Sequence, residues 1–116
     1  MATKALKREN RPELRGFVRG VSRDLGDLLE EIILFGSAAR GSLKPDSDID
    51  VLVVLKRRSL SSSREVTRLA TEMLLRYGRY LSVKIMTRRM FQNLLRLETP
   101  FMLNIRRDGK VLWKKG

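Results

Sequence analysis

The sequence predicts an α/β fold, in which helices pack on a small β-sheet. Two segments, 14–29 and 66–77, carry apolar residues at the three- and four-residue spacing of amphipathic helices. Apolar runs of strand length occupy 32–35 and 51–55, and residues 81–86 alternate between apolar and polar. Because strands and helices alternate along the chain, the order of elements is that of an α/β domain.

The first helix is expected from Pro12 to Leu29. Its apolar residues recur on one face, and proline suits the first turn of a helix. Three glycines within this segment lower its helix propensity, so packing must supply its stability. Residues 31–35 follow as a short buried strand, which Gly36 ends.

A short helix and a second strand are expected next. Ser37 is the expected N-cap of a helix that reaches 40–41, and a loop at 42–47 follows. The second strand covers 48–55. Nearly every position after Asp50 is apolar, so we expect this strand to be buried on both faces.

A long helix and a third strand follow a serine-rich loop at 59–63. Ser62 and Glu65 fit a capping box at the start of the helix, and Gly78 is a natural stop. The alternation at 80–86 then predicts a strand that is apolar on one face and polar on the other.

Two short helices and a strand complete the chain. Thr87 is the expected cap of a helix that reaches Leu97, and Thr99 with the proline after it starts another. An Asp-Gly turn then leads to a short strand at 111–113. We see no internal repeat.

Length and composition exclude several classes of protein. The chain has 116 residues, a length that predicts a single domain, here at 12–116. The polar and basic residues at 1–11 are expected to form a flexible tail. No stretch approaches the ~20 apolar residues of a membrane span, and 1–11 lacks the apolar core of a secretory signal, so we expect a cytoplasmic protein. The chain has no Cys and no His, so any metal must be held by oxygen.

The chain is strongly basic, with a net charge of +12 from 25 Lys and Arg against 13 Asp and Glu. This charge favours anionic partners: a nucleoside triphosphate, nucleic acid or an acidic protein. Lys44, Arg57 and Arg58 are candidates for steering an anion, although a solvated basic surface accounts equally well for most individual charges.

The most informative segment is 34–54. It reads as a strand, a Gly36-Ser37 turn at a helix start, a loop, and a second strand that opens with Asp48 and Asp50. Residues two apart in a strand point the same way, so both carboxylates leave one face. Paired carboxylates can hold Mg²⁺, and backbone N–H groups at a Gly-Ser turn can bind phosphate.

This arrangement resembles the nucleotidyltransferase superfamily, which includes the DNA polymerase β-like enzymes, and is most similar to the minimal nucleotidyltransferases. The similar motifs are Gly-Ser-Ala-Ala-Arg-Gly at 36–41 and Ser-Asp-Ile-Asp at 47–50. The likeness covers roughly 12–113, but only 34–54 is specific. It implies a polymerase β palm-like fold with a mixed sheet.

The resemblance also implies functional residues. Asp48 and Asp50 would be catalytic and would bind Mg²⁺, which would bridge the triphosphate oxygens as pyrophosphate leaves. The nucleotide, for which ATP is the first expectation, would contact four residues: Gly36, Ser37, Arg40 and Ser47. Arg40 would either contact phosphate or pair with a carboxylate such as Asp46, and Ser47 would orient the loop.

One position departs from the family pattern. Relatives usually carry a third Asp on the strand after the long helix, where this chain has Lys84. A positive charge there would repel a metal ion and pair with Asp48 or Asp50 instead. Shifting the alignment by two residues brings Ser82 to that position, again without a carboxylate. Glu98 and Asp108 are candidate substitutes.

Three functions therefore stay open. The chain is an active nucleotidyltransferase with one Mg²⁺, a nucleotide-binding regulatory partner that has lost transfer, or a basic nucleic-acid-binding domain. Small members of the family often pair with a separate helical protein, and in some such pairs the transferase acts as an antitoxin by modifying a Tyr of that partner. The resemblance therefore also implies a helical partner protein or a homodimer.

Overall fold

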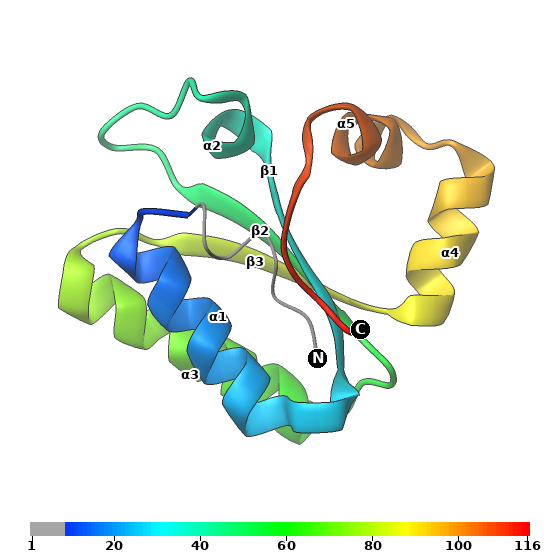
Figure 1. Cartoon of the computed structure of the whole chain (residues 1–116), viewed down its shortest axis with the longest axis horizontal. Coiled ribbons are helices and arrows are strands. Elements are labelled where there is room, and N and C mark those ends of the chain that lie inside the picture. The colour runs from blue at the N-terminus through cyan, green and yellow to red at the C-terminus, as the bar shows by residue number, and fades with distance from the viewer. Residues whose placement is uncertain (1–8) are drawn as a thin grey trace.

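The computed structural model describes residues 9–116, which form a four-stranded sheet with helices on both faces (Figure 1). Residues 1–8 of the expected basic tail lie outside the described part. The elements are α1 (Pro12–Leu25), η2 (Gly26–Leu28), β1 (Leu29–Phe35), α2 (Gly36–Arg40), β2 (Ile49–Leu55), α3 (Leu60–Tyr77), β3 (Leu81–Thr87), α4 (Arg88–Leu97), α5 (Pro100–Asp108) and β4 (Lys110–Lys114).

The sheet is mixed, as the family resemblance implies. Its strand order is β3-β2-β1-β4. β1 pairs antiparallel with β2 and with β4, whereas β2 pairs parallel with β3 through α3. The α/β architecture predicted from the order of elements is confirmed.

The two faces of the sheet carry separate apolar clusters. α1 and α3 cover one face, with core residues such as Phe17, Val53 and Leu69. α4 and α5 lie on the other, where Leu52 and Met102 belong to the second cluster. Successive residues of β2 alternate between these clusters, so the predicted burial of this strand on both faces is confirmed.

The first helix is shorter than its apolar spacing predicts. α1 ends at Leu25, a 3-10 turn follows, and Leu29 begins β1. Leu29 is buried in the sheet, and an apolar side chain suits a buried strand position as well as the buried face of a helix. The apolar spacing therefore could not show where the helix ends. Gly26, with φ of 51°, provides the change of direction between the two elements.

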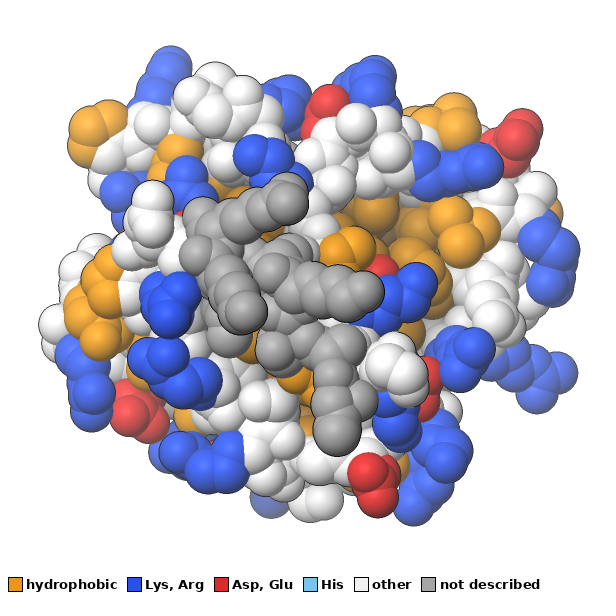
Figure 2. Space-filling view, viewed as in Figure 1, with side chains coloured by type: hydrophobic (Ala, Val, Ile, Leu, Met, Phe, Trp, Pro, Cys, Tyr) orange, Lys and Arg blue, Asp and Glu red, His pale blue; other side chains and the backbone are white. Residues whose placement is uncertain are grey.

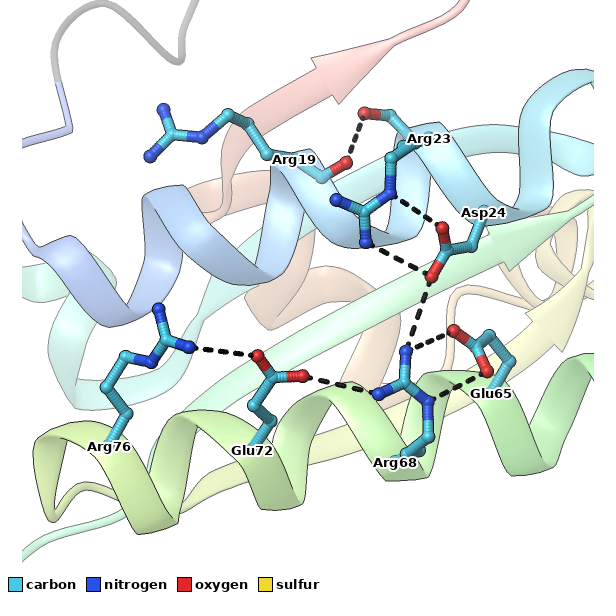
Figure 3. Close-up of polar contacts among 8 residues, drawn as sticks. Arg19, Arg23, Asp24, Glu65, Arg68, Glu72 and Arg76 are labelled. Atoms are coloured by element: carbon cyan, nitrogen blue, oxygen red, sulfur yellow. Dashed lines mark hydrogen bonds and ion pairs between the residues drawn. The ribbon is translucent and has the colours of Figure 1, made fainter.

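Close packing against α3 explains the glycines of α1. A Cβ on Gly20 would lie 2.7 Å from Cδ2 of Leu69, so only glycine lets the helices approach this closely. Ion pairs span the same interface, because Arg68 of α3 reaches Asp24 of α1 at 3.4 Å (Figure 3). Packing thus supplies the stability that helix propensity lacks.

The cap of α3 differs from the prediction. Ser59 is the N-cap and forms a capping box with Ser62, so 59–63 is the helix start rather than a loop. Glu65 instead forms an ion pair with Arg68 at 2.6 Å. Several serines in this run can cap a helix, and the predicted capping box began three residues after the observed one.

The C-terminal elements agree closely with expectation. Thr87 caps α4 by accepting a hydrogen bond from the Met90 N–H at 3.1 Å. Thr99 caps α5 in the same way, and β4 pairs with the edge of β1. None of the described helices is long and apolar enough to cross a membrane.

The surface is basic, as the composition requires. Figure 2 shows Lys and Arg side chains spread around the visible face, with few acidic ones between them. Apolar side chains gather in a hollow beside α4 and α5 on the same face. The charge is therefore distributed rather than confined to one stripe.

Candidate functional site

The predicted motif forms one compact site where β1 ends and β2 begins. In the antiparallel pair, Phe35 lies opposite Asp50, so the turn into α2 sits directly beside this carboxylate. Asp50 shares its face of the sheet with Leu52, which is the face covered by α4 and α5. The site therefore lies at one end of the sheet, beside α2 and α5.

The backbone of Gly36 lies directly against the Asp50 carboxylate. Gly36 has φ of 72°, a backbone conformation that favours glycine. A Cβ at this position would overlap the Asp50 carboxylate and lie 3.2 Å from its Cγ. The turn therefore requires glycine for two independent reasons.

Asp48 and Asp50 are neighbours in space as well as in sequence. Burial raises the pKa of Asp50, and the negative charge of Asp48 raises it further, while Lys84 and Arg40 oppose the shift. Neither Asp forms a hydrogen bond or an ion pair within residues 9–116. On so basic a protein, two adjacent carboxylates without a basic partner form a natural cation site.

Ser37 lies inside the short helix rather than at its start. Phe35 occupies the N-cap position of α2, and no side chain caps the helix there. The predicted N-cap role of Ser37 is wrong, because α2 begins at Gly36, two residues before the start at Ala38 that a Ser37 N-cap implies. Ser37 is half-buried beside the Gly36 turn, so it stays within the site.

The loop before β2 is held by Arg79, which sequence reasoning missed. Its guanidinium donates to the carbonyls of Lys44, at 3.1 Å, and Ser47, at 2.6 Å. Ser47 thus belongs to the loop that positions Asp48, through its carbonyl. Parallel neighbouring strands begin at the same edge of the sheet, so Arg79, just before β3, lies beside the loop before β2, a proximity that no local pattern of the sequence indicates.

Arg40 has a different partner from the one predicted. Its guanidinium lies 3.9 Å from the Asp108 carboxylate of α5, and it forms no ion pair with Asp46. Asp108 also pairs with Arg107 at 3.1 Å. Arg40 is exposed, and its positive charge opposes the raised pKa of Asp50, so it lies near the site.

The third carboxylate of the family pattern is absent from the described site. The parallel register places Ser82 opposite Asp50, and Lys84 opposite Leu52 one pair further on. Contrary to prediction, Lys84 forms no ion pair with either Asp at 4.0 Å or less; its ammonium lies 6.0 Å from the centre of the Phe101 ring.

Neither candidate substitute completes an acidic triad. Asp108 is engaged by Arg107 and Arg40, and Glu98 is the exposed C-cap of α4. Among residues 9–116, no group of three Asp or Glu is arranged to hold a metal ion. Asp48 and Asp50 are therefore the carboxylates of this site that could hold a cation.

Two of the three basic candidates lie away from the site. Arg57 and Arg58 follow β2, whereas Asp50 lies at its beginning, seven residues earlier on an extended strand. Arg58 donates instead to the carbonyl of Ile85 at 3.1 Å, a structural contact. Lys44 lies in the loop before β2, so it stays near the carboxylates.

Comparison with known proteins identifies the family. A family model described as nucleotidyltransferase domain matches residues 14–106, most of the chain. This chain belongs to the nucleotidyltransferase domain family. Its similarity to that family extends far beyond the loop and the two carboxylates, as the order of elements implied.

Curated relatives include two proteins of Methanocaldococcus jannaschii. "Putative protein adenylyltransferase MJ0604" is 30% identical over 100 residues, which cover 86% of this chain and 94% of that protein. "Putative protein adenylyltransferase MJ0141" is 35% identical over 65 residues, or 55% of this chain and 66% of that protein. The nucleotidyltransferase likeness thus spans nearly the whole of one relative and about two thirds of the other.

Solved structures share the nucleotidyltransferase fold. A chain in the crystal structure of a toxin–antitoxin with AMP-PNP aligns with a TM-score of 0.57 at 23% identity, covering 90% of this chain and 75% of that one. A chain of a mutant toxin–antitoxin MntA-HpeT aligns with a TM-score of 0.56 at 20% identity and the same coverage. At these identities the likeness shows the fold.

Proposed function

We propose that this nucleotidyltransferase transfers a nucleoside monophosphate from a triphosphate, ATP in the first instance, to a hydroxyl group of a partner protein. The observation that carries the proposal is the pair Asp48 and Asp50, adjacent and without a basic partner, against the Gly36 turn. Two carboxylates with no His or Cys nearby are oxygen donors suited to Mg²⁺.

Each residue of the site has a role in this proposal. Asp48 and Asp50 would hold Mg²⁺, which when bound supplies positive charge to the phosphate oxygens. Gly36 has no side chain to displace the Asp50 carboxylate, and Ser37 would offer its hydroxyl and N–H to the triphosphate. Arg40 faces the same space and would contact a phosphate oxygen.

The reaction follows the usual course of nucleotidyl transfer. The acceptor oxygen forms a bond to the α-phosphorus, and the bond from that phosphorus to the oxygen bridging to the β-phosphate breaks. Pyrophosphate leaves with the electron pair of the broken bond, and the hydroxyl proton passes to solvent. The residues of the chain position the triphosphate in line for this displacement and stabilise its charge.

A protein acceptor is supported by the relatives. Two are described as protein adenylyltransferases, and the solved neighbours come from toxin–antitoxin complexes, one of them with AMP-PNP. The apolar hollow beside α4 and α5 and the basic surface around it offer room for another chain (Figure 2). We therefore propose a hydroxyl of a separate protein as the acceptor.

The test is transfer of label from ATP that carries ³²P at its α-phosphate, in Mg²⁺, to protein in an extract of the source organism. We expect wild type and the loop variant Asp46→Asn to label a protein. Asp50→Asn should slow labelling roughly a thousandfold, the scale on which loss of a charge-stabilising group slows phosphoryl transfer. Equal labelling by Asp50→Asn would contradict the proposal.

One observation favours a second function. Lys84 occupies the strand on which the family resemblance places a third carboxylate, which suits a nucleotide-binding partner protein without transfer activity. Such a protein would bind ATP with Mg²⁺ and leave no label on any protein, with or without the Asp50 carboxylate. The labelling experiment therefore separates the two functions.

A further inference from the structure

Lys84 lies on the same face of the sheet as the two carboxylates. Paired residues of neighbouring strands project to the same side, and the β2–β3 register pairs Asp50 with Ser82 and Leu52 with Lys84. Asp50 and Leu52 both face α4 and α5. The ammonium of Lys84 therefore stands on the reacting side of the sheet, one residue pair beyond Asp50.

The Lys84 side chain is exposed, and no described residue neutralises its ammonium. Within residues 9–116 it forms no ion pair and no hydrogen bond. It lies 6.0 Å from the centre of the Phe101 ring, at the limit of a cation–π contact. Phe101 in turn packs edge-on against Phe35, with ring centres 5.3 Å apart and planes at 88°.

This aromatic pair ties Lys84 to the site itself. Phe35 is the residue paired with Asp50 in the β1–β2 register and the one that precedes Gly36. Lys84 lies on the strand next to that of Asp50 and on the same face of the sheet. The chain thus presents two unpaired carboxylates and one unpaired ammonium on one face.

We propose that Lys84 takes the place of a second metal ion and binds a non-bridging phosphate oxygen of the triphosphate. The site then takes up one divalent cation per bound nucleotide rather than two. This inference rests on the proposed function. Within residues 9–116, two carboxylates and no third would leave one cation site, and the unpaired Lys84 ammonium would supply the other positive charge that a triphosphate needs.

The first test is binding of α,β-methylene-ATP, which cannot be cleaved at the bond that transfer breaks, measured by calorimetry in Mg²⁺. Lys84→Met keeps the apolar stem and removes the charge, so binding should weaken roughly tenfold, as for loss of one charge-assisted hydrogen bond. Lys56→Met removes the same charge at the far end of β2 and should leave binding unchanged. Equal affinities for both variants would overturn the inference.

The second test counts bound Mn²⁺ by electron paramagnetic resonance with the same analogue present. Wild type should bind one ion per chain, and Lys84→Asp, which supplies the third carboxylate, should bind two. Two ions in wild type would overturn the inference and leave the proposed function standing. Wild type that does not bind the analogue would overturn the proposed function, and the inference with it.

Discussion

At the scale of single residues, the site depends on the contact between Gly36 and Asp50. The sequence motif predicted that both belong to one site, and the structure shows why glycine is required. Gly36 and Gly41 both have positive φ, 72° and 76°, but only at Gly36 would a Cβ meet another residue. Substituting Ala at Gly41 therefore tests backbone strain alone, whereas Ala at Gly36 tests the same strain together with displacement of the Asp50 carboxylate.

Gly41→Ala should destabilise the protein by about 1–2 kcal/mol because it places Ala in the left-handed region, and Gly36→Ala should cost at least as much because its Cβ also meets Asp50. Only Gly36→Ala should also slow transfer, roughly a hundredfold, as expected for a reacting group displaced by about 1 Å. Thermal melting and the labelling assay measure the two effects. Equal loss of transfer in both variants would mean that the Gly36–Asp50 contact is unimportant.

Residues that act through long-range contacts were not predictable from the sequence. The motif identifies Asp48, Asp50 and Gly36 because their spacing is local. The Arg79 bonds to the loop and the Phe101 contact with Lys84 join residues 32 and 17 positions apart or more, and no local pattern encodes them. The ion pair between Arg40 and Asp108 was not predictable either, because it depends on the packing of α5 beside α2.

At the scale of elements, ion pairs complement the packing of α1 on α3. Arg68 bonds to Glu65 at 2.6 Å, to Glu72 at 3.3 Å and to Asp24 at 3.4 Å, and Arg23 bonds to Asp24 at 2.8 Å (Figure 3). Helical periodicity predicted both helices. It could not predict that they would lie side by side with these charges facing.

The pH dependence of stability tests this network. The bond from Arg23, with a further contribution from the charge of Arg68, lowers the pKa of Asp24 from 3.8 to about 2. A lowered pKa favours the ionised form in the folded state, so the stabilisation is complete above 3.8 and is lost as pH falls toward 2.

Asp24→Asn should therefore lower the melting temperature at neutral pH, and the difference from wild type should vanish as pH falls from about 5 to about 2. Asp27→Asn is the matched control, since the Asp27 side chain forms no ion pair within residues 9–116. A difference from wild type that persists at the acid limit would rule out ionisation of Asp24 as its cause.

At the scale of the whole molecule, the sequence predicted the order of elements and the mixed sheet. Two predicted boundaries differ from the structure, at Leu29 and at Ser59. At Leu29 an apolar residue suits both a helix and a strand, and at Ser59 one of several serines can cap the helix. The parallel β2–β3 pair is what brings Lys84 to the face of Asp50. In the sequence alone, Lys84 was recognisable only because it stands where the family pattern has an Asp.

The central claim is that Asp48 and Asp50 bind the nucleotide through a divalent cation. The most direct measurement is calorimetric titration of ATP in Mg²⁺ against wild type, Asp48→Asn/Asp50→Asn and the loop control Asp46→Asn. We predict binding by wild type and by the control that disappears when Mg²⁺ is removed, and no binding by the double variant. Unchanged binding by the double variant, or none by wild type, would contradict the claim.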